Sequence, residues 1–383
     1  MAGLNCIDKG LRIWRVEGGL ALLSRLHKKL LSASNSVGIL ASILHRLQSG
    51  SDDKSAERQY VSRLGREIAN FKTVTNVHDL PAIFHYWAHN FLQPKCEVMG
   101  IQDLTEFFVG YARVACRADP TRTCYVASLG AGNCETEVAI AEHLLANHMT
   151  NFVLDCIDLN PHMLARGRDL AAARGVAQHL RFVDSDIKGW SIDREYAVVM
   201  ANQSLHHFQE LELLFRKTQR ALGDEGLFVV SDVIGRNGHM RWPEALEVVH
   251  RIWKTMPERY KYNHLLRRHE RMYDNWDCSV GGFEGIRAQD ILPLLVKHFH
   301  FELFLAYGNI IDIFIDRAFG HNFDVACEED RRFIDMVGRL DDDLIDRGVV
   351  KPTHLFAVMR NRASCETRVY RHWTQEFCLR HVP

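Results

Sequence analysis

The sequence lacks several features that would assign it to a particular class of protein. No uncharged apolar run reaches the roughly 18–20 residues that a membrane-spanning helix needs. The 10 cysteines are scattered without a C-x-x-C pair, and the histidines do not show metal-ligand spacing. A net charge of −1 leaves no excess of basic residues for nucleic acid. These absences argue against a membrane protein, a disulfide scaffold and a nucleic-acid-binding protein.

The overall composition is that of a soluble globular protein. Apolar residues make up 47% and charged residues 25% of 383 positions, enough for one large domain or two coupled domains. Charged residues such as Lys9 and Arg12 soon follow Met1, which is not the pattern of a secretory signal. Together with the scattered cysteines, this predicts a cytoplasmic protein with reduced thiols.

The first third of the chain is predicted to be helical. Residues 1–120 show apolar positions three or four apart and no alternation typical of strands, and a polar interruption at 49–55 is a plausible linker. This region could act as a cap or as a dimerisation element. Its first 75 residues are locally basic, which is more often a solvated face than a binding site for a polyanion. The C-terminal tail, 363–383, gives no interpretable pattern.

From residue 121 to 362 the pattern changes to short apolar runs separated by helix-length segments. Runs that are apolar on both faces are typical of strands buried between two helical layers, and their alternation with helices predicts a doubly wound, mostly parallel α/β sheet. Seven strands are expected, at 125–129, 152–157, 180–183, 196–200, 227–231, 300–306 and 354–359.

Two long segments interrupt the expected alternation of strands and helices. The first, 236–298, is dense in aromatic and basic residues, and the second, 309–352, separates the last two strands. Both begin after the carboxyl end of a strand, the edge at which open α/β sheets bind ligands. We therefore predict that they form helical lid insertions over a binding site.

The most informative segment is the turn after the first expected strand. Gly130 and Gly132 leave this turn without side chains, so that a ligand can approach the backbone at the start of the next helix. Glu135 stands where the third glycine of a dinucleotide fingerprint would be, and its carboxylate would repel a pyrophosphate. The turn therefore favours a ligand with a cationic centre and no phosphate.

Over roughly residues 121–235 the chain resembles the class I S-adenosylmethionine-dependent methyltransferases. The resemblance rests on the glycine turn and on Asp158, Asp186 and Asn202, which end or follow successive strands in order and at near-even spacing. It implies S-adenosylmethionine as methyl donor and S-adenosylhomocysteine as product. It also implies cofactor contacts from Leu129, Gly130, Ala131 and Gly132 (methionine portion and ribose), Asp158 (ribose hydroxyls), Leu159 and Met163 (beside adenine), Asp186 and Ile187 (adenine), and Asn202 (methionyl group).

Methylation at oxygen needs a base, and histidine is the usual one near neutral pH. His206 and His207 follow the fourth expected strand, and His239 begins the first insertion after the fifth. These three are the candidate catalytic residues. No metal is expected, because Asn202 and Gln203 stand where a metal-assisted O-methyltransferase would need an acid after the fourth strand.

The sequence thus predicts an S-adenosylmethionine-dependent methyltransferase that acts on an oxygen of a small-molecule acceptor. The large insertions favour an enclosed site over a protein substrate, and no nucleic-acid or membrane partner is expected. A homodimer is possible. Two alternatives stay open: methylation at nitrogen or carbon, and a non-catalytic scaffold that binds S-adenosylmethionine and acts through its helical N-terminal region.

Overall fold

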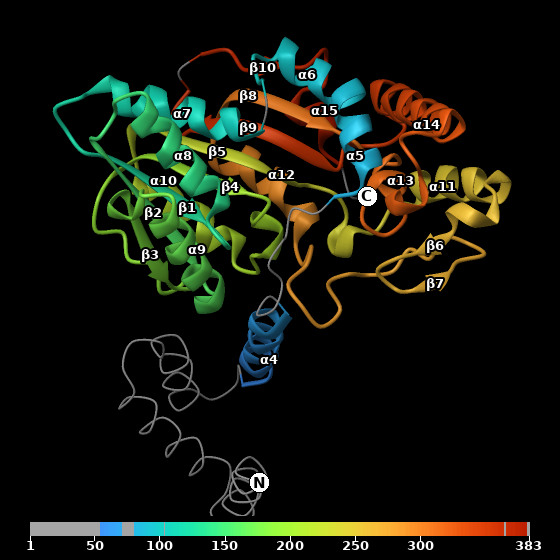
Figure 1. The fold of residues 1–383 in the computed structure, drawn as a ribbon, viewed down its shortest axis with the longest axis horizontal. Helices are drawn as coiled ribbons and strands as arrows, with labels where there is room; N and C mark the ends of the chain where they lie inside the picture. The colour runs from blue at the N-terminus through green and yellow to red at the C-terminus, as the bar shows by residue number, and fades with distance from the viewer. Residues whose placement is uncertain (1–53, 71–79, 103, 364, 381–383) are drawn as a thin grey trace, which may run out of the picture.

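The computed structural model describes residues 54–70, 80–102, 104–363 and 365–380 (Figure 1). The expected helices before residue 54 and most of the predicted linker lie outside the described residues. The strands of the main sheet are β1 (Cys124–Leu129), β2 (Phe152–Asp158), β3 (Leu180–Asp184), β4 (Tyr196–Asn202), β5 (Leu222–Val233), β8 (His300–Tyr307), β9 (His354–Arg360) and β10 (Arg368–Val369), and a separate hairpin consists of β6 (Tyr262–Asn263) and β7 (Arg268–His269).

Helices alternate with these strands along the chain. They are α4 (Lys54–Asn70), α5 (Ala82–Trp87), η1 (Ala88–Leu92), α6 (Gln93–Val98), α7 (Leu104–Ala118), α8 (Glu135–Ala146), α9 (Pro161–Ala173), η2 (Ala177–His179), η3 (Leu205–His207), α10 (Leu211–Ala221), η4 (Asn237–His239), α11 (Pro243–Thr255), η5 (Glu258–Tyr260), α12 (Ala288–His298), α13 (Asp312–Ile315), η6 (Gly320–Asn322), α14 (Glu328–Asp346) and α15 (Gln375–Cys378).

The sheet confirms the predicted doubly wound α/β architecture. Its strand order is β10-β8-β9-β5-β4-β1-β2-β3. The strands from β3 to β5 are parallel, while β9 runs antiparallel to both β5 and β8. The sheet has eight strands rather than the expected seven, because β10 pairs two residues with β8. A two-residue strand within the tail has no sequence pattern by which it could be recognised.

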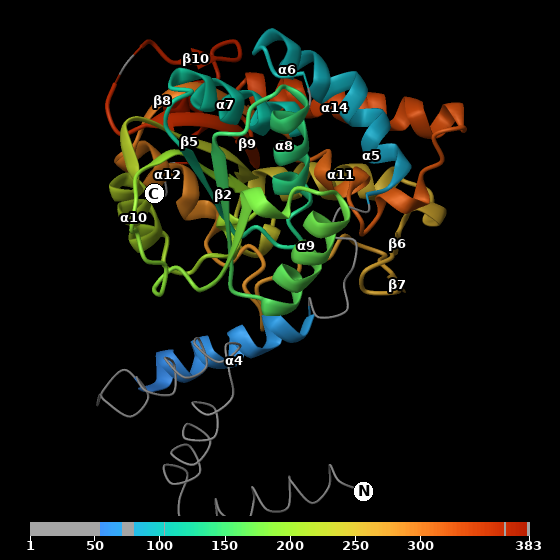
Figure 2. The same cartoon turned by 60° about the vertical axis from the view of Figure 1, so that its left-hand side comes forward.

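Helices cover both faces of the sheet, which explains the apolar strands. One layer contains α7, α8 and α9, and the other contains α10 and α12 (Figures 1 and 2). In β4, the run Val198–Ala201 is fully buried, as expected for a central strand between two helical layers. Parallel strands bring their carboxyl ends to one edge, so the turns after β1, β2 and β4 lie near one another.

The two long segments after β5 and β8 fold as additions to this core. The first contains η4, α11, η5 and the β6–β7 hairpin. It therefore adds a short hairpin to the helices that were expected there. Its last part, α12, packs in the helical layer beside α10 rather than in an insertion. The second contains α13, η6 and α14, which pack against α5. The aromatic Trp87 of α5 is buried there beside Tyr307, and therefore serves packing.

Candidate functional site

The glycine turn brings the backbone after β1 against the neighbouring strand ends. Gly130 (φ +72°) and Gly132 (φ +57°) both adopt left-handed conformations. The N–H groups of Gly130 and Ala131 donate to the carbonyl of Ile157, at 2.8 and 3.1 Å, which ties the turn to β2. A Cβ at Gly130 would lie 2.6 Å from the Cβ of Ser204, so this position admits no side chain. The turn after Leu129 is thus a side-chain-free edge beside the end of β4.

We expect Gly130→Ala to lower the free energy of unfolding by about 1–3 kcal/mol and to weaken S-adenosylmethionine binding on the order of ten-fold. The matched control is Gly175→Ala, because Gly175 has nearly the same φ (+71°) but nothing within 4 Å of an added Cβ. Isothermal titration and urea unfolding measure the two effects. Equal binding losses in the two variants would contradict a role for the close packing at Gly130.

Asp158, the last residue of β2, is held by the backbone around it. Its Oδ2 accepts from the N–H of Gly132 at 2.8 Å, and its Oδ1 accepts from the N–H of Asn160 at 2.7 Å. Burial raises the pKa of Asp158, although the two backbone donors and nearby His207 oppose the shift. Each carboxylate oxygen can accept a second hydrogen bond. Asp158 can therefore receive the two hydroxyls of a ribose without losing its backbone contacts.

Of the residues expected around adenine, Leu159 follows β2, Asp186 and Ile187 follow β3, and Met163 lies on α9. Met163 is buried, and its Cε would be 3.2 Å from a Cβ at Gly132. Leu159 packs in a small apolar cluster, and Ile187, the residue after Asp186, is buried. Asp186 accepts from the N–H of Gly189 through Oδ1, at 2.8 Å. Its other oxygen, Oδ2, accepts from a tyrosine hydroxyl at 3.4 Å.

Asn202 at the end of β4 carries an unused acceptor. Its amide nitrogen donates to the hydroxyl of Thr136 at 3.1 Å. Its Oδ1 is buried, and no group among the described residues donates to it. An amine of a bound ligand would satisfy this oxygen. The open glycine turn, the acceptors of Asp158 and the orphaned Oδ1 of Asn202 together fit the ribose and methionyl parts of S-adenosylmethionine.

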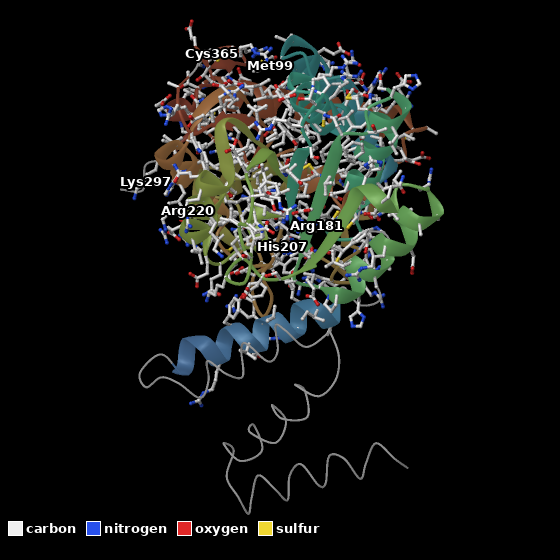
Figure 3. The ribbon with its side chains drawn as sticks, turned by 90° about the vertical axis from the view of Figure 1, so that its left-hand side faces the viewer. Met99, Arg181, His207, Arg220, Lys297 and Cys365 are labelled. Atoms are coloured by element: carbon white, nitrogen blue, oxygen red, sulfur yellow. The ribbon has the colours of Figure 1, made fainter. Side chains whose placement is uncertain are left out.

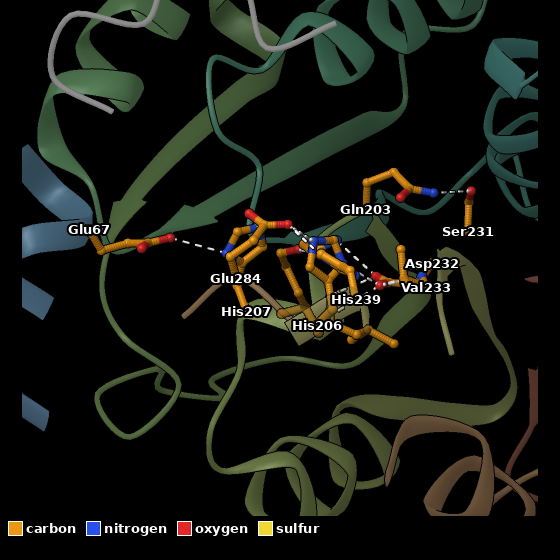
Figure 4. Close-up of polar contacts among 12 residues, drawn as sticks. Glu67, Gln203, His206, His207, Ser231, Asp232, Val233, His239 and Glu284 are labelled. Carbon is orange, nitrogen blue, oxygen red and sulfur yellow. Dashed lines mark hydrogen bonds and ion pairs between the residues drawn. The ribbon is translucent and has the colours of Figure 1, made fainter. Parts of the chain in front are cut away.

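The three candidate histidines lie together at the carboxyl ends of β4 and β5 (Figure 4). His206 and His207 form η3, and their rings are 4.3 Å apart. The ring of His239, on η4, lies 5.3 Å from that of His206. One carboxylate, Glu284, contacts all three: His239 Nε2 at 2.6 Å, His206 Nε2 at 3.5 Å and His207 Nε2 at 3.6 Å. We call these four residues the histidine cluster.

His206 is a buried, charged member of the cluster. Its Nδ1 lies 2.6 Å from Oδ1 of Asp232, and the other oxygen of this carboxylate, Oδ2, accepts from the backbone N–H groups of Ser204 and Leu205. Burial disfavours the charged imidazole, but the carboxylates of Asp232 and Glu284 outweigh it and raise the pKa of His206 to about 10. At neutral pH this ring therefore carries a proton on each nitrogen and cannot accept another.

His239 is the neutral member of the cluster. Burial lowers the pKa of His239, more than the hydrogen bond with Glu284 raises it. Its Nε2 donates to Glu284, and among the described residues no hydrogen bond involves its Nδ1. The pKa of Glu284 is well below its usual range, because the hydrogen bonds from His206 and His239 outweigh the effect of burial. The tautomer set by Glu284 leaves Nδ1 of His239 able to accept a proton.

His207 lies between two acidic side chains. Its Nδ1 is 3.1 Å from Oε1 of Glu67, which belongs to α4, and its Nε2 faces Glu284. Figure 3 shows His207 at the end of the sheet next to α4. The side chain is 25% exposed, in contrast to 6% for His206. α4 thus contacts the histidine cluster at His207, through Glu67.

Part of the cluster has the spacing of a metal site. Within the part of the chain that the structure describes, ligand atoms of His206, His239 and Glu284 lie within 4.8 Å of one another. Both nitrogens of His206 face carboxylates, so as an imidazolium it has no lone pair to offer an ion. The same spacing is accounted for by the hydrogen bonds and ion pairs just described, and the expectation of a metal-free site stays a prediction.

Comparison with known proteins identifies the central part of the chain. Residues 128–228, from the end of β1 into β5, match the family model of a methyltransferase domain. Residues 128–228 form a methyltransferase domain, for which S-adenosylmethionine is the methyl donor. The match includes the glycine turn, Asp158, Asp186, Asn202 and the histidines of η3. The sequence has no significant match among curated proteins.

Several solved structures are similar to the methyltransferase at low identity. The StiE O-MT segment, residues 961–1257, is 15% identical with a TM-score of 0.38, covering 67% of this chain and 74% of that one. The plantazolicin methyltransferase BpumL with SAH is 13% identical (TM-score 0.37; 80% and 99% covered). The O-methyltransferase from the trans-AT PKS multienzyme of Brevibacillus brevis with S-adenosyl-L-homocysteine is 11% identical (TM-score 0.39; 75% and 85% covered).

Two acidic residues of the site had no recognisable signal in the sequence. Glu284 lies in a loop of the first insertion, and Glu67 lies on a helix before the methyltransferase domain. Neither belongs to a motif, and each comes close to the histidines only through the tertiary fold.

No helix in the described ranges combines the length and the apolar character needed to cross a bilayer.

We expect Asp158→Ala to weaken S-adenosylmethionine binding by about 1.5–3 kcal/mol, roughly 10- to 150-fold in Kd, because a charged acceptor is lost. The matched control is Asp184→Ala, since Asp184 ends the adjacent strand and is the register partner of Asp158. Isothermal titration of both variants measures the difference. Unchanged affinity in the Asp158 variant would exclude the ribose role.

Proposed function

We propose that the methyltransferase transfers a methyl group to a hydroxyl oxygen of a small molecule, with His239 as general base. The observation that carries this proposal is the neutral imidazole of His239, oriented by Glu284 at the carboxyl ends of β4 and β5. An oxygen acceptor must lose its proton as it attacks, and a positioned base near neutral pH contributes typically 10²–10⁴-fold.

The residues of the cluster divide this task. His239 takes the hydroxyl proton at Nδ1, and the carboxylate of Glu284 stabilises the imidazolium that forms. The imidazolium of His206, held by Asp232, contacts Oε1 of Glu284, the same oxygen that accepts from His239, and helps to fix this carboxylate. S-adenosylmethionine, when bound, supplies an electrophilic methyl group. The glycine turn, Asp158, Leu159, Met163, Asp186, Ile187 and Asn202 would hold it, and alignment of the reactants can contribute roughly 7–11 kcal/mol.

A group of polar side chains from the two insertions and β9 supports a small, polar acceptor. Arg241 is buried and pairs with Asp312 at 3.2 Å, and this aspartate also accepts from the hydroxyl of Thr353 at 2.6 Å. His354 interacts electrostatically with this pair and with His239, and burial lowers the pKa of His354. These groups come from both insertions and from the start of β9, and they offer hydrogen-bonding partners to an acceptor beside the cluster.

The test is turnover of the purified methyltransferase with S-adenosylmethionine and a panel of small alcohols, phenols, amines and carbon acids. Formation of S-adenosylhomocysteine together with an O-methyl product by mass spectrometry would support the proposal. An N-methyl or C-methyl product would overturn the oxygen assignment. Binding of S-adenosylmethionine without turnover across the panel would favour the non-catalytic scaffold. The cytoplasmic location and a homodimer remain predictions; no disulfide joins the nine cysteines that the structure describes.

A further inference from the structure

One face of α4 packs against the methyltransferase site. Tyr60, Arg63, Leu64 and Glu67 stand at positions i, i+3, i+4 and i+7 of the helix and therefore lie on the same side of it. Leu64 is 4% exposed and forms an apolar cluster with Phe283, against which Tyr60 and Leu159 also pack. Figure 2 shows α4 crossing below the two helical layers, beneath α9.

The N-terminal half of this face reaches the side expected to hold adenine. The hydroxyl of Tyr60 donates to Oδ2 of Asp186 at 3.4 Å. The ammonium of Lys188 lies 4.9 Å from the centre of the Tyr60 ring, a cation–π contact with the segment after β3. Leu159, after β2, belongs to the same apolar cluster as Leu64. A ligand bound by Asp186 and Leu159 would therefore contact α4 directly.

The C-terminal half of the same face reaches the histidine cluster. The buried carboxylate of Glu67 pairs with Nδ1 of His207 at 3.1 Å and accepts from the N–H of Phe283 at 3.4 Å. Arg63 donates to the carbonyls of Ser279 and Gly282, at 3.2 and 2.9 Å. These bonds hold the loop 279–286, which carries Glu284, against the helix.

We propose that docking of α4 couples cofactor binding to the assembly of the histidine cluster, and that Glu67 is the positioning residue in this coupling. The inference rests on the proposed function. A cofactor that contacts the adenine side of α4 favours its docked position by the free energy of those contacts. The docked helix then fixes His207 through Glu67, and fixes Glu284 through the loop that Arg63 and Glu67 hold.

The first test needs no methyl acceptor. Hydrogen exchange of residues 58–69 is measured with and without S-adenosylhomocysteine, and we expect exchange to slow on the order of ten-fold when the ligand binds. Leu64→Asp, which prevents docking, should abolish the slowing. Binding without any slowing overturns this inference alone. Failure of S-adenosylhomocysteine to bind overturns the proposed function as well.

The second test separates positioning from folding. Glu67→Gln keeps the size of the side chain and should lower kcat on the order of ten-fold, while KM for S-adenosylmethionine and Tm stay unchanged. The control Ser62→Ala, on the exposed side of α4, should leave kcat unchanged. A Glu67→Gln enzyme with normal kcat would show that α4 covers the site without positioning the cluster. That result would overturn the role of Glu67.

Discussion

Replacing His239 with alanine is expected to lower kcat by roughly 10²–10⁴-fold, with S-adenosylmethionine affinity within about two-fold of wild type. The expected loss is large because His239 is the neutral imidazole of the cluster, while His206 is already protonated at neutral pH. Rates of S-adenosylhomocysteine formation and isothermal titration give the two quantities. The matched control is His269→Ala, an exposed histidine of β7 in the same insertion.

The pH dependence of kcat gives an independent check on this base. The pKa of His239 is lowered from its ordinary value of 6.5, so the neutral form predominates at pH 7 and activity should fall only as pH drops below about 6.5. The groups facing His239 are Glu284, His206, His207 and His354, of which Glu284 raises the pKa of His239. Glu284→Gln should therefore move the acid limb to still lower pH and reduce the plateau rate. An acid limb that moves to higher pH would contradict this assignment.

The fold could be predicted from the sequence because its main elements are local patterns. Strands buried on both faces, such as β1 and β4, consist of short apolar runs that stand out between helices. The hairpin β6–β7 and the strand β10 were missed, because two-residue strands have no periodicity. The candidate cofactor residues stay a prediction; most of them end or follow a strand that the pattern defines, while Met163 lies on α9.

The sequence predicts the histidines of the cluster but not their acidic partners. Histidines directly after β4 and β5 can be predicted to meet, because parallel strands place their carboxyl ends together. Their acidic partners Glu67 and Glu284 lie 140 and 77 positions away from His207 in sequence, on a helix and a loop without a motif. The charge states of His206 and His239 depend on these partners and on burial. Sequence alone therefore could not decide which histidine is neutral.

We expect His206→Gln to lower the free energy of unfolding by about 3–5 kcal/mol at pH 7, because it leaves Asp232 as a buried carboxylate without its cation. The side chains of His206 and Asp232 are 6% and 0% exposed, so solvent screens this pair little. The matched double variant, His206→Gln with Asp232→Asn, removes the unpaired charge and should lose less than the single variant. Urea unfolding of the three proteins measures the differences.

The same pair should make wild-type stability fall with rising pH. The folded-state pKa of His206 is raised from 6.5 to about 10, so its stabilisation is complete below about pH 6.5 and is lost as pH approaches 10. The groups facing His206 are Asp232, Glu284, His207 and His239, and the first two hold its proton. His206→Gln should therefore show a smaller loss of stability between pH 6.5 and 10 than wild type. Equal losses over that range would mean that His206 is uncharged in the folded protein, and Glu284 would then lack the cation that fixes it beside His239.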